Sequence, residues 1–404
     1  MILRMRAPAL TSVVAALALA MLAGPATGNP TAPVDAVPGG SDVVVAVGDS
    51  FISGEAGRWR GNVWDIANAS RADALGPRAY WATPTGESWP GCHRSRGAEI
   101  ALPGTVSVNL ACAGARTSST LNRSTFVPGL DDGLTDPASG SRLPGQLTLL
   151  SRLANRTRVR LVAVSIGGND MGFSSIVRNC ATRFLAPWPF ARECRTLPAV
   201  RDRMSDAALR RVADSTEQAI VRVHATLAAA GYADTDWSLI VQGYPRPLAE
   251  TNRYPDTRSA RGYGGGCPFR DADVRWIDAR LKVLSADLAG AARRAEAATG
   301  HPVHFMDLTD AFAGRELCAR GAESVDRIPA RDVTARAERV SMVRLFAPFR
   351  VDESLHPNAL GQRVLRACLA AAWKSGAPRS GSCSSPLDWS RTRADGLPAV
   401  RFRG

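Results

Sequence analysis

Residues 43–54 read VVVAVGDSFISG, an apolar run that ends in Gly48-Asp49-Ser50. A run without polar alternation is typical of a strand buried on both faces of a parallel sheet. In sheets of this kind, ligands bind beyond the carboxyl ends of the strands. Ser50 therefore stands directly after the first expected strand, at a place where a functional residue is expected.

Four further apolar runs of strand length follow, and amphipathic helical patterns lie between them. Strands that alternate with helices predict a parallel, doubly wound sheet. Ser205 is a candidate N-cap for one helix, Asp271–Thr299 repeats the helical pattern, and Ala359–Trp373 forms the last helix. The five expected strands are Val43–Val47, Val106–Leu110, Val159–Ser165, Ser238–Gly243 and Val303–Leu308.

Two later motifs complement the serine. Gly167-Gly168-Asn169-Asp170 follows the third strand, and Ser354-Leu355-His356-Pro357 precedes the last helix. A serine hydroxyl needs a base to become a nucleophile, and histidine is the usual base near neutral pH. His356 is the one histidine that lies in a proline-bounded turn before a helix, with acids just upstream. The motifs predict serine-based acyl transfer, with Asn169 stabilising an oxyanion.

Two familiar classes of serine hydrolase do not fit this order. The chain has no G-x-S-x-G pentapeptide, which an α/β-hydrolase needs. A chymotrypsin-like protease has Gly-Asp-Ser followed by Gly, late in the chain and after its histidine. Here Phe51 follows, Ser50 comes first and His356 comes last.

The order of these motifs resembles the SGNH (GDSL) hydrolase family, in its secreted actinobacterial type. The resemblance covers residues 43–373 and adds one more block, Asn109-Leu110-Ala111-Cys112-Ala113-Gly114-Ala115. It implies a three-layer α/β/α sandwich with a five-stranded parallel flavodoxin-like sheet. By analogy Ser50 is the nucleophile, and the oxyanion hole consists of the Ser50 amide, the Gly114 amide and the Asn169 side chain.

One position departs from the family pattern. The family usually places Asp three residues before the histidine, where this chain has Glu353, and Asp352 is one residue further back. The third group orients the imidazole and stabilises its cation. Some secreted actinobacterial relatives use a main-chain carbonyl instead. We expect a Ser50–His356 dyad supported by Glu353, and the choice between Glu353, Asp352 and a backbone carbonyl stays open.

The N-terminus has the pattern of a secretory signal. Arg4 and Arg6 precede the apolar run Val13–Ala23, and Ala26-Thr27-Gly28 is a small-x-small cleavage site. The run is too short to span a bilayer comfortably, so we expect a secreted, extracellular protein without a transmembrane segment. The expected divisions are a signal peptide (1–28), a linker (29–41), an SGNH hydrolase domain (42–375) and a C-terminal tail (376–404).

Eight cysteines in an exported chain indicate disulfides, and no Cys/His cluster has zinc spacing. His301 and His304 flank a strand start, but no carboxylate accompanies them in the sequence, and we expect His224 to be structural. We therefore expect no metal and no cofactor. Pairing sequence neighbours proposes the disulfides Cys92–Cys112, Cys180–Cys194, Cys267–Cys318 and Cys368–Cys383.

The chain carries a net charge of +13, and only Lys282 and Lys374 of its 50 basic residues are lysines. The arginines are scattered without a basic and aromatic stripe, so we expect no nucleic-acid partner. A GC-rich genome favours arginine codons and so explains the high arginine content. Attraction of the positive surface to anionic lipid or cell-wall polymer would then be a secondary consequence of that charge. We expect a monomer.

Two segments bear on the substrate. Leu185–Phe190 is an apolar stretch that either contacts lipid or packs inward. Lipid or phospholipid acyl esters are the first substrate class we expect, and acetyl groups on extracellular polysaccharide are the second. The rivals are a non-catalytic envelope-binding protein on the same scaffold, and phosphodiester hydrolysis. Four tryptophans after the serine either wall an acyl or sugar pocket or form an added sub-core: Trp59, Trp64, Trp81 and Trp89.

Overall fold

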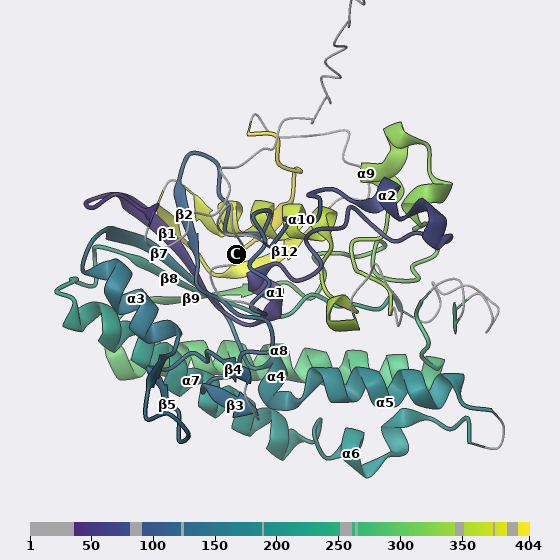
Figure 1. Ribbon diagram of the computed structural model, residues 1–404, viewed down its shortest axis with the longest axis horizontal. Helices are drawn as coiled ribbons and strands as arrows, with labels where there is room; N and C mark the ends of the chain where they lie inside the picture. Colours follow the sequence, from purple (N-terminus) through teal and green to yellow (C-terminus); the bar gives the residue numbers. More distant parts are fainter. Residues whose placement is uncertain are drawn as a thin grey trace, which may run out of the picture.

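The computed structural model contains a central sheet with helices on both faces (Figure 1). The expected signal peptide and most of the expected linker lie outside the described residues. The structure describes residues 36–80, 91–122, 125–187, 190–250, 261–262, 266–343, 351–374, 376–385 and 395–404.

The central sheet has seven strands in the order β13-β12-β9-β8-β7-β1-β2. The five consecutive strands from β9 to the edge strand β2, in the order β9-β8-β7-β1-β2, run parallel and match the five expected strands to within one residue at each end. This order is the doubly wound arrangement that the sequence predicts, and the α/β fold class is confirmed. The seven strands are β1 (Asp42–Gly48), β2 (Val106–Asn109), β7 (Arg158–Ser165), β8 (Ser238–Gln242), β9 (Val303–Asp307), β12 (Gly381–Ser384) and β13 (Arg401–Arg403).

Strand β1 shows why the apolar run has no alternation. Val43, Val45 and Val47 join one buried cluster, while Val44 and Ala46 join another. All five side chains are buried because helices cover both faces of the sheet. Full burial of such a side chain contributes roughly 1.5–3 kcal/mol, so both faces stabilise the strand.

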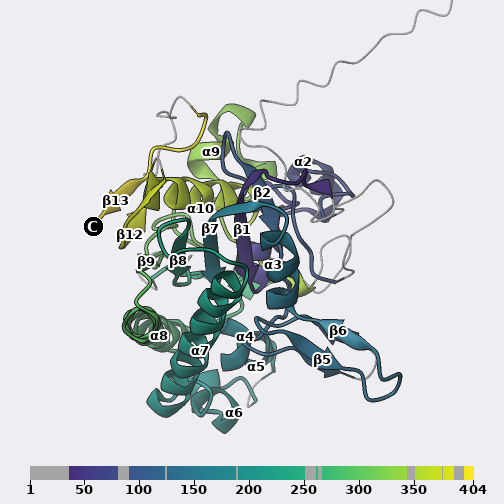
Figure 2. The same ribbon diagram turned by 90° about the vertical axis from the view of Figure 1, so that its left-hand side faces the viewer.

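Helices α3, α7 and α8 lie on one side of the sheet and α10 lies on the other (Figures 1 and 2). Ser205 caps α7 as expected, since its side chain accepts a hydrogen bond from the Ala208 N–H. The helices are α1 (Ser50–Ser53), α2 (Ala69–Ala72), α3 (Gln146–Ala154), α4 (Gly168–Met171), α5 (Phe173–Leu185), α6 (Pro198–Arg201), α7 (Asp206–Ala229), α8 (Asp271–Thr299), α9 (Val333–Arg336) and α10 (Ala359–Ala372).

Two strands of the sheet come from the segment expected to be a tail. Strand β12 pairs in parallel with β9, and β13 pairs antiparallel with β12. The Cys368–Cys383 disulfide joins β12 to α10, which covers the same region of the sheet. Strand β12 has no clear strand pattern in the sequence, because Gly381–Ser384 reads GSCS and lacks the β-branched residues that favour a strand.

The remaining described strands form short antiparallel pairs outside the main sheet. None of the helices in the described ranges is both long and apolar enough to cross a bilayer. The short strands are β3 (Thr120–Asn122), β4 (Thr125–Val127), β5 (Gly133–Thr135), β6 (Arg142–Pro144), β10 (Trp373–Lys374) and β11 (Ala377–Pro378).

The eight cysteines form the four pairs proposed from sequence neighbourhood, which confirms those pairings. Each pair closes a short or moderate loop, with sequence separations between 14 and 51. The pairs are Cys92–Cys112, Cys180–Cys194, Cys267–Cys318 and Cys368–Cys383.

Candidate active site

The candidate site lies beyond the carboxyl ends of the parallel strands. Ser50 is the first residue of α1, directly after β1, and Asn169 lies in α4, directly after β7. Strands β1 and β7 are neighbours, although β2 comes between them in the chain. The order of the sheet therefore reverses between β1 and β7, which is the place where doubly wound sheets bind ligands.

The turn at the end of β1 requires a glycine. Gly48 has a φ of +135°, and a Cβ there would collide with the backbone of Ser165 on β7. The Gln146 side chain holds this turn from α3, since its Oε1 accepts from the Gly48 N–H at 2.7 Å and its Nε2 donates to the Gly48 carbonyl at 2.8 Å. These contacts fix the backbone immediately before the serine.

Asp49 positions the serine by capping its helix. Asp49 Oδ1 accepts a hydrogen bond from the Phe51 N–H, and the Tyr244 hydroxyl donates to Asp49 Oδ2 at 2.5 Å. The same Tyr244 oxygen accepts from the Gly168 N–H at 2.8 Å, which links the β1 turn to the β7 turn. Burial raises the pKa of Asp49 to about 7, and the hydrogen bond from Tyr244 acts in the opposite direction.

Ser50 and His356 meet although 306 residues separate them in the chain. Ser50 Oγ lies 2.7 Å from His356 Nε2, and both residues are buried. His356 Nδ1 lies 3.1 Å from the Ser354 carbonyl oxygen. A carbonyl oxygen only accepts, so Nδ1 carries the proton, and Nε2 accepts the hydrogen bond of the Ser50 hydroxyl.

The surroundings of the imidazole keep it neutral. The ring centroids of Phe51 and Phe173 lie 4.9 and 5.7 Å from that of His356. Burial lowers the pKa of His356 to about 4, and the carbonyl of Ser354 acts in the opposite direction. A neutral imidazole can remove a proton, so the base is in its active form across the neutral range.

The Glu353 carboxylate bonds to groups other than the imidazole. It accepts hydrogen bonds from Trp59 Nε1 at 2.8 Å and from the Tyr80 hydroxyl at 2.7 Å. The imidazole bonds to the main chain of its own turn: Nδ1 lies 3.1 Å from the Ser354 carbonyl oxygen, and backbone hydrogen bonds of Asp352 and Glu353 also raise the pKa of His356. A backbone carbonyl was one of the alternatives left open, and the residue that supplies it lies two positions before His356.

The turn that presents His356 is held on both sides. Leu355 is buried at a φ of +62°, a conformation that a branched residue adopts only when its surroundings enforce it. Two backbone hydrogen bonds to Ser341 flank it, from the Leu355 N–H and to the His356 carbonyl. Asn358 then caps α10 by accepting from the N–H groups of Leu360 and Gly361.

The three expected oxyanion donors line one cavity with His356. Ser50 is the first residue of its helix, so its N–H has no acceptor within that helix. Gly114 has a φ of +78° and is solvent-exposed. Asn169 Nδ2 donates to the Ala115 carbonyl at 3.0 Å, which fixes the amide plane and leaves its second N–H for a substrate. The cavity has a volume of about 200 Å³.

The Gly114 loop is anchored at both ends. The Cys92–Cys112 disulfide and the bond from the Ala113 N–H to the Cys92 carbonyl hold the residues before it. After it, the Thr117 N–H and hydroxyl both donate to the Asp170 carboxylate. Asp170 adjoins Asn169, so this contact couples the two loops that carry the oxyanion donors.

Sequence reasoning missed a histidine–carboxylate pair at the cavity. His93 Nδ1 lies 2.7 Å from Glu55 Oε2, both side chains are buried, and both line the cavity. Burial raises the pKa of Glu55. Glu55 lies in the Ser50 segment, and His93 adjoins the cysteine that is bonded to Cys112. That disulfide was the signal that could have placed His93 here. Asp352 also lines the cavity.

The segments expected to bear on the substrate contain both buried and exposed apolar side chains. Trp59 is buried against Glu353, while Trp64 is 42% exposed. Leu185 and Phe190, at the two ends of the apolar stretch, are 37% and 64% exposed. Trp81, Trp89 and Trp188 lie outside the described residues.

Comparisons with known proteins found likeness in structure alone. No protein-family model matches the chain, and no curated protein matches it in sequence. An extracellular lipase from Streptomyces rimosus is similar with a TM-score of 0.47 and 21% identity, over 82% of this chain and 100% of that one. Phospholipase A1 from Streptomyces albidoflavus NA297 gives a TM-score of 0.40 and 18% identity, over 82% and 99%.

A third similar structure is an active-site mutant of a family two carbohydrate esterase from Clostridium thermocellum. Its TM-score is 0.37 and its identity 10%, over 84% of this chain and 64% of that one. Identities and scores this low say nothing about the reaction.

Proposed function

We propose that the protein is a serine hydrolase of carboxylic esters, of the SGNH type. The observation that carries the proposal is the hydrogen bond of 2.7 Å between Ser50 Oγ and His356 Nε2, at a cavity that also contains Gly114 and Asn169. A nucleophile, its base and a set of N–H donors at one cavity are the parts that acyl transfer needs.

Acylation begins when His356 Nε2 takes the proton of the Ser50 hydroxyl and Oγ attacks the ester carbonyl carbon. The carbonyl oxygen becomes an oxyanion, which accepts from the N–H groups of Ser50, Gly114 and Asn169. One such donor is worth roughly 3 kcal/mol of transition-state stabilisation. The Ser354 carbonyl stabilises the imidazolium through Nδ1–H. His356 then returns the proton to the departing alkoxide, which leaves as an alcohol.

Deacylation repeats these steps with water. His356 removes a proton from a water molecule, and the resulting hydroxide attacks the acyl carbon on Ser50. The oxyanion forms at the same donors, and its collapse releases the carboxylic acid as Ser50 Oγ recovers its proton from His356. The same groups serve both halves of the reaction, so no cofactor is required in this scheme.

Acyl esters of lipids or phospholipids are the substrate class that we propose first. A second, larger cavity of about 590 Å³ is lined by Asp170 and Met171, the two residues that follow Asn169 in the chain. Three exposed arginines line it, which provides a positive environment for a phosphate group. Its arginines are Arg116, Arg203 and Arg211, and its acids Asp170 and Asp202 moderate their charge.

Acetyl esters of extracellular polysaccharide are the second candidate. The observation that favours them is the cavity at Ser50, which is small, at about 200 Å³, and lined by polar residues such as Glu55 and His93. A short acyl group fits such a space, and polar side chains can bind the hydroxyl groups of a sugar. A long acyl chain would have to extend out of this cavity.

We propose that the protein acts outside the cell as a monomer. The N-terminal signal pattern of residues 1–28 supports export. Four disulfides suit an oxidising compartment. The division into a hydrolase domain over 42–375 and a short C-terminal segment is also a proposal, and pairing of β12 with β9 ties that segment to the domain.

Initial rates on p-nitrophenyl esters from acetate to palmitate, with Ser50→Ala as control, test the proposal. We expect wild-type turnover that the variant loses down to background. Analysis of the products from a phospholipid separates the reaction types. Free fatty acid supports acyl cleavage, whereas a released head group indicates phosphodiester cleavage and contradicts the proposal. Unchanged turnover by Ser50→Ala would also contradict it.

A further inference from the structure

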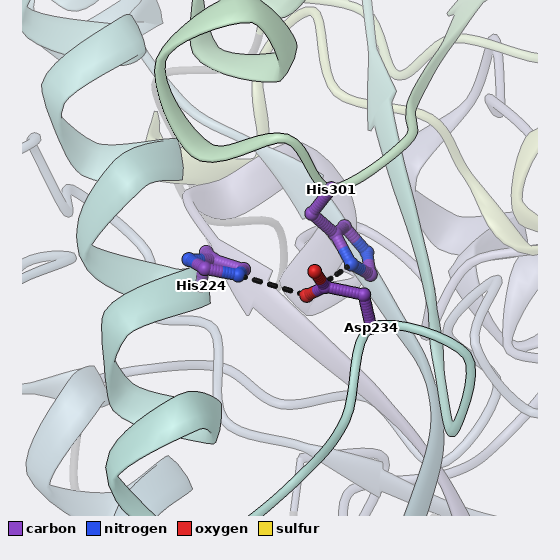
Figure 3. A group of neighbouring side chains, drawn as sticks. All are labelled: His224, Asp234 and His301. Atoms are coloured by element: carbon purple, nitrogen blue, oxygen red, sulfur yellow. Dashed lines mark hydrogen bonds and ion pairs between the residues drawn. The ribbon is translucent and has the colours of Figure 1, made fainter.

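A cluster of two histidines and one aspartate lies far from the Ser50 site in the fold. His224 comes from α7, Asp234 from the loop before β8, and His301 from the loop before β9 (Figure 3). Asp234 and His301 precede parallel strands, whereas Ser50 follows one. The cluster therefore lies at the amino ends of the parallel strands, whereas the candidate active site lies beyond their carboxyl ends.

We propose that His224, Asp234 and His301 form a binding site for a divalent transition metal, with Zn²⁺ as the natural candidate. Each residue offers one ligand atom, and no two of these atoms are more than 4.8 Å apart. Two imidazoles and one carboxylate are a common zinc ligand set. Calcium and magnesium prefer oxygen ligands, so the two nitrogens disfavour them.

The distances within the cluster are close to those of a metal site. Asp234 Oδ1 lies 2.9 Å from His224 Nε2 and 3.2 Å from His301 Nδ1. Ligand atoms of tetrahedral zinc are about 3.3 Å apart, as follows from bonds of about 2.0–2.1 Å. Both imidazoles already point at the carboxylate in Figure 3. A small movement of the side chains would bring the two nitrogens to ligand spacing.

One ligand is held rigidly while the others can adjust. His301 is 1% exposed, and its ring stacks on Trp237 with centroids 4.1 Å apart and an interplanar angle of 16°. The side chains of His224 and Asp234 are 20% and 50% exposed. A fixed buried imidazole beside two more accessible ligands offers a metal ion both a preformed position and a route from solvent.

The protonation of the histidines is compatible with coordination. A coordinating nitrogen must carry a lone pair, so the proton has to be on the other nitrogen of the ring. His301 Nε2 is buried and, within the described ranges, has no hydrogen-bond partner that would fix the tautomer. His301 Nδ1 can therefore bind the metal at the expense of a single contact, its hydrogen bond to Asp234.

The site would connect three segments that the chain brings together only on folding. It would join the C-terminal half of α7 to the loops that lead into β8 and β9. Metal bound to the folded state alone stabilises that state, and the effect grows with the free metal concentration. We expect a structural role, because the cluster lies at the amino ends of the parallel strands and the Ser50 cavity lies beyond their carboxyl ends.

Zinc binding to the chelator-treated chain, purified without a histidine tag, tests the inference. We expect isothermal titration and elemental analysis to give one Zn²⁺ per chain, and the thermal midpoint to rise with zinc. His224→Ala and His301→Ala should each weaken binding at least tenfold. His304→Ala is the matched control, because this half-buried histidine of β9 contributes no ligand atom and should leave binding unchanged.

Asp234→Asn guards against variants that fail to fold, because this side chain is half exposed and its replacement keeps the shape. It should remain folded by circular dichroism and should weaken zinc binding as the histidine variants do. A wild-type chain that binds no zinc would overturn the inference. So would zinc affinity that stays unchanged in His224→Ala, His301→Ala and Asp234→Asn, since the metal would then be bound elsewhere.

Discussion

The protonation of a single imidazole governs the chemistry at the residue scale. His356 must be neutral to act as a base, and a free histidine loses that state below a pH of about 6.5. Burial between Phe51 and Phe173 disfavours the cation, while the Ser354 carbonyl favours it through Nδ1–H. Burial is the larger effect, so the enzyme retains its base under mildly acidic conditions.

The pH profile of kcat/KM should show this shift. We expect activity to fall as the pH drops through the pKa of His356 at about 4, because protonation then blocks Nε2. One unit below 6.5, an unperturbed histidine would leave about a tenth of the activity, whereas this enzyme should keep most of it. Circular dichroism over the same pH range separates titration from unfolding. A midpoint near 6.5 would contradict the argument.

A substitution of Glu353 tests whether its carboxylate acts on the imidazole. Glu353→Gln keeps one acceptor oxygen but turns an amide N–H₂ toward one of the donors, Trp59 Nε1 or the Tyr80 hydroxyl. An unsatisfied buried donor costs about 1–3 kcal/mol, so the urea midpoint should fall. The acid limb of the pH profile should stay where it is in the wild type. A shifted limb would mean that the carboxylate does act on the imidazole.

At the scale of elements, the loops after β2 and β7 have to hold the oxyanion donors in place. The Cys92–Cys112 disulfide and the contact between Thr117 and Asp170 secure them. A misplacement of about 1 Å can cost roughly 10²-fold in rate, because the donors stabilise the oxyanion only when they are correctly positioned. These anchors should therefore affect turnover as well as stability.

Removing either of two disulfides with similar loop lengths distinguishes an effect on turnover from an effect on stability. The Cys92–Cys112 disulfide has a sequence separation of 20 and lies beside Gly114 in the chain. The Cys368–Cys383 disulfide has a sequence separation of 15, and neither of its cysteines lines the cavity. Replacing either pair by serines should cost about 3 kcal/mol of stability. Only the first replacement should also lower kcat, measured at a temperature where both variants are folded. Equal kcat in both variants would contradict a role for that anchor in turnover.

At the scale of the whole molecule, the five parallel strands β1, β2, β7, β8 and β9 could be predicted from the sequence, because a doubly buried strand needs a continuous apolar run. The pairing of Ser50 with His356 also followed from the motifs. The acceptor of the Nδ1–H hydrogen bond could not be predicted, because any backbone carbonyl of the turn could face Nδ1. Strand β12 and the meeting of Asp234 with His224 and His301 depend on tertiary packing, which leaves no local pattern in the sequence.

The net charge of +13 predicts salt dependence on charged interfaces. Raising NaCl from about 0.05 to about 0.5 M shortens the screening length severalfold, so hydrolysis of anionic phospholipid vesicles should slow several-fold. The rate on a soluble neutral p-nitrophenyl ester should change little. An equal decrease on both substrates would show that salt acts on the enzyme rather than on its attraction to the vesicle.

Covalent labelling of Ser50 by a fluorophosphonate tests the central claim most directly. The reagent reacts with a serine hydroxyl only when a base activates it. Intact-mass spectrometry should show one adduct on the wild-type chain, and peptide mapping should place it on Ser50. Ser50→Ala should take up none, and His356→Ala should react far more slowly. An unlabelled wild-type chain, or an adduct on another residue, would contradict the assignment of Ser50 and His356 as nucleophile and base.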